Sequence, residues 1–234
     1  GNALPEITNV HEIEYHNLGI KYNKVEGHTR KFVFGDFNGK RVLIFNRLHF
    51  YESGNLDNLR LLYKIICKLG VKTLLMSTAA GAVNKNLNPA DLVLVTDHIN
   101  LTGQNPLIGN NPVKFLDLKN LYDKELLNIA EKIGESKGIK LNRGIHCQLT
   151  GPTYETPSEI KMLRLLGVDT VSMSPVLDAI EAYSLGIKIL LIAGVTNKAC
   201  DIENDSINHK EVLENAGAMS KNLKTLFEEI MLKL

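Results

Sequence analysis

The stretch Lys188-Ile-Leu-Leu-Ile-Ala-Gly-Val195 carries no polar side chain after its first residue. A run of this length without polar alternation is typical of a strand that is covered on both faces of a sheet. The stretch Lys72-Thr-Leu-Leu-Met-Ser-Thr78 is continuously apolar in its middle and indicates a second strand of this kind. Two such strands favour an α/β domain, in which helices cover a largely buried sheet.

Short β-type runs alternate with helical patterns along the rest of the chain. Besides strands at 72–78 and 187–196, we expect strands at 41–46, 91–96 and 144–149, with 31–35 turning at Asn38-Gly39 into the 41–46 strand as a hairpin. Apolar periodicity predicts helices at 55–69, 123–136, 158–166, 176–185 and 209–232. No repeat or linker interrupts the alternation, so residues 1–234 are expected to form a single domain.

Composition argues against several classes of protein. The 234 residues are 44% hydrophobic and 23% charged, which is ordinary for a globular protein and unlike a disordered or fibrous one. Lys and Arg number 27 against 26 Asp and Glu, so no basic surface for nucleic acid is indicated. The longest apolar run is too short to cross a membrane. Three scattered cysteines without a CxxC pair favour a reducing compartment, and we expect a cytoplasmic enzyme.

A group of polar residues follows the predicted 41–46 strand. Arg47, His49 and Tyr51 alternate, and in an extended segment they would share one face. A guanidinium, an imidazole and a phenol on one face suit an anion beside a hydroxylated ligand. A solvated strand end explains the same residues equally well.

Two further segments combine a strand end with groups that suit a ligand. Small residues at 77–82 would let a ligand approach backbone N–H groups, unless they form only a tight turn. At 151–157, Tyr154 could stack on a planar ligand while Glu155 accepts a hydrogen bond from its edge. The alternative there is helix-start chemistry, with Thr156 as the N-cap.

Three more polar residues adjoin predicted strands or helices. Ser174 precedes the helix predicted at 176–185, where it could contact an anion or simply begin the helix. Asn197 ends the most apolar strand, where it could serve a ligand at the sheet edge or initiate a turn. His209 opens the last predicted helix, and an exposed helix-start residue is the alternative.

Other common motifs are missing from the sequence. No GxGxxG, P-loop or GxSxG pattern occurs, which argues against nucleotide-cofactor dehydrogenases, P-loop NTPases and α/β-hydrolases. The remaining histidines show no metal-ligand spacing and HExxH is absent, so no metal is expected.

Taken together, these segments resemble the trimeric purine nucleoside phosphorylase family over nearly the whole chain. Their number, order and spacing carry the resemblance. The matching segments are Gly27-His28 before Phe32-Val-Phe-Gly35, Arg47-x-His49-x-Tyr51-Glu52, Ala79-Ala80-Gly81, Asp97-His98-Ile-Asn-Leu101 with Gly103-Gln-Asn-Pro-Leu107, Gly151-Pro-Thr-Tyr-Glu-Thr156, Met173-Ser174, Thr196-Asn197-Lys198 and Asn208-His209-x-Glu211-Val-Leu213.

The resemblance implies a three-layer α/β sandwich around a mixed, partly barrel-like sheet, the nucleoside phosphorylase fold, usually assembled as a homotrimer. It implies phosphorolysis of inosine, guanosine and their 2′-deoxy forms to a free purine base and (deoxy)ribose 1-phosphate. Inorganic phosphate is then a co-substrate, and neither a metal nor an organic cofactor is implied.

The resemblance also assigns roles to single residues. Phosphate would be held by Arg47, His49, Ser174, the backbone N–H of Ala79, the nearby His28 and Asn2. The ribose would be held by Tyr51, Met173 and His209. The base would be held by Tyr154, Glu155, Asn197 and Val171. Asn197, Glu155 and His49 would be the catalytic residues. Phe115 would be the counterpart of a phenylalanine that enters the site from a neighbouring subunit.

The base and ribose residues bear on specificity. Glu155 would pair with the N1–H group of hypoxanthine or guanine, whereas adenine presents an acceptor there. Asn197 would donate to N7 or O6 of the leaving base. The related methylthioadenosine phosphorylases carry an aspartate in place of Asn197 and an apolar residue in place of His209. Both residues therefore favour 6-oxopurine nucleosides with a free 5′-hydroxyl.

This sequence departs from the family pattern at several positions. Asn2 stands where the family has a phosphate-binding serine, and the apolar strand that precedes that loop in the family is not part of this sequence. Ser172 and Pro175 replace a glycine and a threonine. These departures keep three alternatives open: a methylthioadenosine phosphorylase-like enzyme, a catalytically weak nucleoside-binding relative, and a nucleosidase that uses water instead of phosphate.

Overall fold

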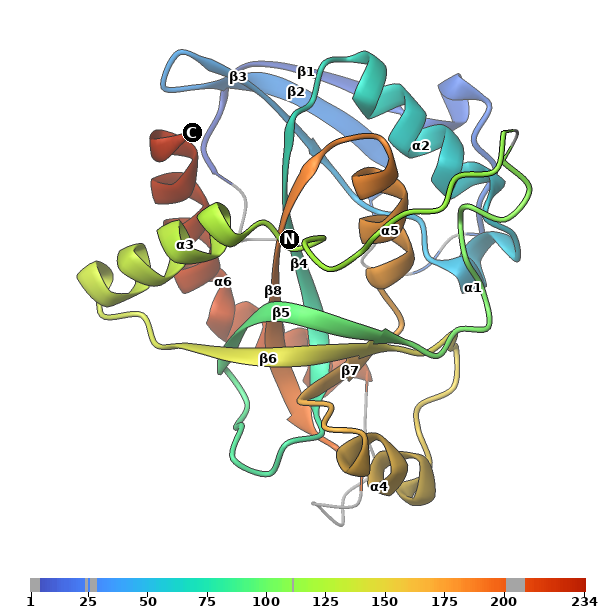
Figure 1. Cartoon of the computed structure of the whole chain (residues 1–234). Coiled ribbons are helices and arrows are strands. Elements are labelled where there is room, and N and C mark those ends of the chain that lie inside the picture. Colours follow the sequence, from blue (N-terminus) through green and yellow to red (C-terminus); the bar gives the residue numbers. More distant parts are fainter. Residues whose placement is uncertain (1–4, 24, 26–28, 111, 201–208) are drawn as a thin grey trace.

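The computed structural model of this chain describes residues 5–23, 25, 29–110, 112–200 and 209–234, and only the backbone of 209–218. Its strands form two sheets (Figure 1). A closed mixed barrel has the order β4-β7-β6-β5-β8, made of β4 (Thr73–Ala82), β5 (Leu92–Asn100), β6 (Leu141–Gln148), β7 (Thr170–Ser172) and β8 (Lys188–Lys198). A separate antiparallel sheet joins β1 (Thr8–Glu14), β2 (Lys31–Phe37) and β3 (Lys40–Phe45). The expected α/β fold around a mixed, barrel-like sheet is confirmed.

The two most apolar runs lie beside each other as parallel strands. β4 pairs with β8 along their whole length, and Leu190 and Leu191 of β8 are fully buried. Helices cover this pair on both sides (Figure 1), which explains why the runs show no polar alternation. The covering helices are α3 (Lys124–Lys137), α5 (Val176–Ser184) and α6 (His209–Lys233), and α2 (Asp57–Lys68) packs against α5.

Two of the described helices begin at a residue whose side chain caps them. Asp123 accepts a hydrogen bond from the Leu126 amide at the start of α3. Thr156 and Glu159 form a reciprocal capping box at the start of α4 (Pro157–Leu165), with Pro157 as the first helical residue. No described helix is long and apolar enough to span a bilayer.

The structure differs from the expected elements in several places. β4 and β8 run on to Ala82 and Lys198, so the small residues after Ser77 and the amide of Asn197 lie within strands, and the turn interpretations were wrong. β1 is exposed at every position and β7 has three residues, so neither shows a periodic pattern. The short helices η1 (Tyr15–Leu18) and α1 (Phe50–Ser53) were also not predicted.

The barrel register brings distant residues into one row. β8 places Asn197 beside Gly81 of β4, Gly81 pairs with Val171 of β7, and Val171 pairs with Cys147 of β6. The β4–β8 register shifts between Ala80 and Gly81, directly before this row. Asn197 and Val171, both predicted to hold the base, therefore lie on either side of Gly81 on neighbouring strands.

Candidate active site

A cavity of about 970 Å³ is lined by residues of the barrel, the three-stranded sheet and α6. Part of its wall is apolar, where β2 and β3 face α6 through Val33, Ile44 and Phe227. Most of the site residues predicted from the sequence line this cavity: Arg47, His49, Tyr51, Ala79, Tyr154, Glu155, Val171, Met173, Ser174 and Asn197.

One end of the cavity is cationic and rich in hydroxyl groups. Arg47 donates from Nη1 to the Ser77 carbonyl at 2.9 Å and from Nη2 to the Ser174 hydroxyl at 3.3 Å. Its Nε is buried and has no hydrogen-bond partner among the described residues. A guanidinium held by two neighbours, with a donor left over, suits an anion that accepts several hydrogen bonds.

A buried ion pair orients His49 beside this end. Glu52 is 1% exposed, and its Oε1 lies 2.7 Å from Nδ1 of His49. Arg30, itself 5% exposed, donates from Nε to Oε2 of Glu52 at 2.9 Å and also from Nη2 to Oε1. Because the carboxylate receives the Nδ1–H of His49, Glu52 sets the orientation of the ring.

The sequence analysis did not assign Arg30 or Glu52 to the site. Glu52 follows His49 by three residues, and this spacing on one helical turn was the available signal. Arg30 gave no local signal, because it reaches Glu52 from a segment 22 residues away.

Tyr51 reaches the site by a different route than expected. Arg47, His49 and Tyr51 do not share one extended face, because Tyr51 lies in α1. The ring of Tyr51 stacks on the ring of His49, with centroids 5.0 Å apart and planes inclined by 17°. Burial, helped by the charge of Glu52, raises the pKa of Tyr51 to about 12, so its hydroxyl stays protonated.

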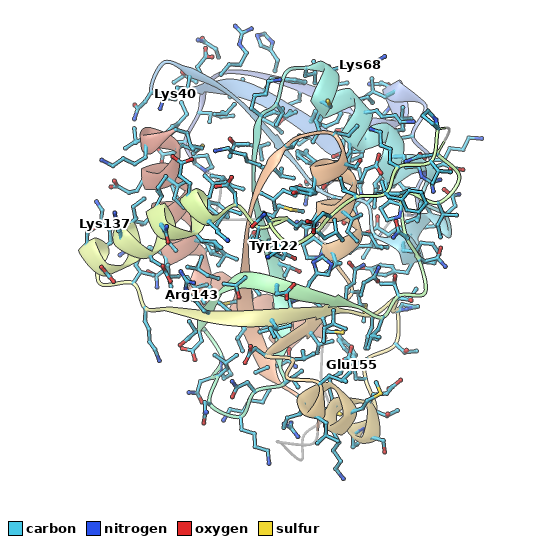
Figure 2. The ribbon with its side chains drawn as sticks, in the orientation of Figure 1. Lys40, Lys68, Tyr122, Lys137, Arg143 and Glu155 are labelled. Atoms are coloured by element: carbon cyan, nitrogen blue, oxygen red, sulfur yellow. The ribbon has the colours of Figure 1, made fainter. Side chains whose placement is uncertain are left out.

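The other end of the cavity carries an aromatic ring and a carboxyl group. Tyr154 and Glu155 directly precede the start of α4, where Figure 2 labels Glu155. The cap of α4 is made by Thr156 and Glu159, so the helix start does not use the Glu155 side chain. The helix cap and a ligand site at Tyr154 and Glu155 are therefore compatible, because they use different side chains. Burial raises the pKa of the Glu155 carboxyl above its usual range.

Asn197 presents a fixed amide to the same end. Its Oδ1 accepts from the Thr196 hydroxyl at 2.9 Å, and one N–H of Nδ2 donates to the Lys198 carbonyl at 3.0 Å. An amide has a second N–H, which remains for a ligand. The amide lies close to β4, because a Cβ at Gly81 would make ordinary contacts of 3.4 Å with Nδ2 of Asn197 and 3.7 Å with Cγ1 of Val171.

Three of the predicted site residues lie wholly or partly outside the described part of the chain, and a fourth lies away from the cavity. Asn2 and His28 lie outside the described residues. His209 is the first residue of α6, and its side chain also lies outside them. Phe115 is 97% exposed and lines a separate hollow of about 450 Å³ together with Lys114 and Ile180. Within the described part of the chain, no group of three or more His, Cys, Asp or Glu is arranged to hold a metal ion.

Known proteins resemble this chain in sequence and in structure. The model of the Phosphorylase superfamily matches residues 3–231. Purine nucleoside phosphorylase 1 of Bacillus subtilis is 37% identical over 92% of this chain and 81% of its own length. Purine nucleoside phosphorylase of Mus musculus is 36% identical over 88% of this chain and 76% of its own length.

Solved structures agree with the sequence matches. Schistosoma mansoni purine nucleoside phosphorylase in complex with inosine superposes with a TM-score of 0.91 and 32% identity, covering 97% of this chain and 85% of that one. A Schistosoma enzyme in complex with guanosine gives a TM-score of 0.90 and 30% identity, covering 100% and 88%. The family model, the relatives and the shared fold all indicate the same family. The chain belongs to the phosphorylase superfamily, among the purine nucleoside phosphorylases.

Proposed function

We propose that this protein cleaves inosine and guanosine, and their 2′-deoxy forms, with inorganic phosphate to give a purine base and (deoxy)ribose 1-phosphate. The observation that carries the proposal is one cavity lined by two chemically different groups of residues. Arg47, His49 and Ser174 suit an anion, and Glu155 and Asn197 suit the edge of a purine. The relatives that match most of the chain bear the corresponding name.

Phosphate takes the cationic end in this proposal. Arg47 and Ser174 are already 3.3 Å apart, and both can donate to phosphate oxygens. Hydrogen bonds to a charged group contribute about 1.5–3 kcal/mol each. His49, oriented through Nδ1 by Glu52, lines the same cavity and is assigned to the phosphate. The backbone N–H of Ala79 is our further candidate, together with His28 and Asn2.

The reaction breaks the bond between C1′ of the sugar and N9 of the purine and forms a bond from C1′ to a phosphate oxygen. Positive charge develops on the sugar, where the phosphate anion stabilises it, and negative charge develops on the leaving base. Asn197 offers its second N–H to N7 or O6 of that base. Donors placed where charge develops often supply the largest catalytic contribution. Fixing the two substrates in line supplies much of the rest.

Recognition of the base and ribose falls to the remaining residues of the cavity. Glu155 accepts from N1–H of a 6-oxopurine, Tyr154 stacks on the ring, and Val171 packs beside it. A mismatched pair of acceptors, as adenine would present to Glu155, can cost about 10⁴-fold in discrimination. Tyr51, Met173 and His209 are assigned to the ribose. The protonated phenol of Tyr51 suits a sugar hydroxyl.

The proposal needs no metal or organic cofactor, because phosphate is the nucleophile and stabilises the charge on the sugar, while Asn197 donates to the leaving base. We further propose a homotrimer of a cytoplasmic enzyme of purine salvage. The exposed Phe115, on a loop with other exposed apolar side chains, is suited to enter a neighbouring subunit. Cys67, Cys147 and Cys200 form no disulfide with one another, which fits a reducing compartment.

The first prediction concerns phosphate. We expect hypoxanthine release from inosine only when phosphate is added, because the cationic end of the cavity binds the nucleophile. Release is followed by absorbance or chromatography, with methylthioadenosine as a parallel substrate that reacts poorly. Release without phosphate would indicate a nucleosidase, and efficient methylthioadenosine cleavage would contradict the assignment of the base pocket.

The second prediction concerns Asn197. We expect Asn197→Ala to lower kcat by about a hundredfold, because its hydrogen bond strengthens as charge leaves with the base. The KM for phosphate should change by less than about twofold, since phosphate lies at the other end of the cavity. Steady-state kinetics with both substrates test this. Asn142→Ala is the control, because Asn142 bonds weakly to the Leu92 carbonyl and does not line the cavity. An unchanged kcat would remove Asn197 from the reaction.

The third prediction concerns Glu155. We expect Glu155→Ala to impair both the inosine and the guanosine reactions, since each base presents N1–H. Because burial raises the pKa of Glu155, kcat/KM of the unmodified enzyme should fall as the pH drops through that raised pKa and the carboxylate is protonated. Glu159→Ala, which removes the exposed capping carboxylate of α4, should keep the activity at neutral pH and move the fall to a slightly lower pH, because the charge of Glu159 also raises the pKa of Glu155. An unchanged rate with either nucleoside would refute the role.

The fourth prediction concerns assembly. Sedimentation should show a trimer, and Phe115→Ala should raise the KM for inosine several-fold, because the neighbouring site loses an apolar wall. Val113→Ala, at an exposed position of the same loop, is the matched control. A fully active monomer would contradict both parts of this prediction.

A further inference from the structure

A buried cluster of polar side chains lies behind Ser174 and has no part in the reaction described above. His146 comes from β6, Thr170 and Ser172 come from β7, and Thr78 comes from β4. His146 and Thr170 are both fully buried. Ser172 is one of the residues that depart from the family pattern.

The contacts of His146 fix its protonation state and its tautomer. Nε2 lies 3.0 Å from the Ser174 carbonyl, which can only accept, so Nε2 must carry the hydrogen. Nδ1 lies 2.9 Å from the Thr170 hydroxyl, its register partner across β6 and β7, and accepts from it. Burial lowers the pKa of His146 to about 4, so the ring is neutral at working pH.

Ser172 completes the arrangement. Its hydroxyl donates to the same Ser174 carbonyl and lies 3.1 Å from Nε2 of His146. The Ser174 amide lies 3.4 Å from that hydroxyl. The extra side chain thus binds the backbone of Ser174. Side chains of the cluster therefore contact both the amide and the carbonyl of Ser174. The Ser174 hydroxyl lies within hydrogen-bond distance of Arg47 and Thr78.

We propose that His146, acting with Ser172, is a positioning residue that holds Ser174 in the orientation required to bind phosphate. His146 does not line the cavity and touches no substrate. This inference rests on the proposed function, since Ser174 is assigned to phosphate there. The same contacts explain why a serine fits at position 172, because its hydroxyl contacts both the Ser174 carbonyl and Nε2 of His146.

The test compares two substitutions with a matched control. His146→Leu removes the donor to the Ser174 carbonyl, while His146→Gln keeps an amide N–H that can replace it. His98→Leu is the control, because His98 pairs with His146 across β5 and β6, bonds to the Tyr122 hydroxyl and does not line the cavity. Dissociation constants for inorganic phosphate are measured by calorimetry, and KM values for phosphate and inosine by kinetics.

We expect His146→Leu to weaken phosphate binding about tenfold, since the Ser174 carbonyl loses one of its donors and the backbone of Ser174 is held less firmly. The KM for inosine should change by less than about twofold, and His146→Gln should recover most of the phosphate affinity. His98→Leu should bind phosphate normally. Equal losses of phosphate and inosine affinity in His146→Leu, or no loss of either, would overturn the proposal.

A second measurement covers the case in which His146→Leu does not fold. Nitrogen-15 NMR of the histidine rings in the unmodified protein should show a neutral ring protonated at Nε2, and Thr170→Val should shift that signal and weaken phosphate binding. An Nδ1-protonated ring would refute the proposal. If the unmodified protein binds phosphate but does not cleave inosine, the proposed function fails while the effect of His146 is still measured by calorimetry. Absence of phosphate binding would overturn both.

Discussion

The parallel pairing of β4 with β8 is the constraint on which the site depends. These two strands are the most apolar of the chain, and burial of such surface contributes about 25 cal/mol for each Å² removed from water. Their pairing fixes where each strand ends and brings Ala79 and Asn197 to the same cavity. The register shift after Ala80 aligns Asn197, Gly81 and Val171 in one row. Since a slip by one residue would reverse every side chain in a strand, this register decides which groups face the ligand.

Several polar groups buried around the cavity make their hydrogen bonds within the protein. Glu52 is shared by Arg30 and His49, and the Ser174 carbonyl is shared by His146 and Ser172. Such networks stabilise one geometry, because breaking any member leaves a buried group unsatisfied. Both networks support residues that face the anion-binding end. The geometry of that end is therefore set by side chains that do not all contact the ligand.

The two ends of the cavity meet opposite electrostatic needs. Arg47 supplies positive charge where phosphate would bind, and Glu155 supplies an acceptor where a 6-oxopurine would present N1–H. Burial affects these groups differently. It keeps the phenol of Tyr51 protonated, and it makes Glu155 easier to protonate than an exposed carboxyl. A single cavity can thus bind an anion and recognise a neutral base without one group interfering with the other.

The sequence by itself determined the α/β class, the buried strands, the helix starts at Asp123 and Thr156, and the chemistry of the candidate residues, because these depend on local periodicity and on side-chain type. Ten residues named from the sequence line one cavity. Only the tertiary structure decided the closed barrel, the placement of Tyr51 on a helical turn, and the partners Arg30, Glu52 and His146. The strand β1, exposed throughout, has no pattern to detect. The contacts of Arg30 with Glu52 and of His146 with Ser174 could not be predicted, because they join segments distant in the chain. A polar side chain also needs such a contact only once folding has buried it.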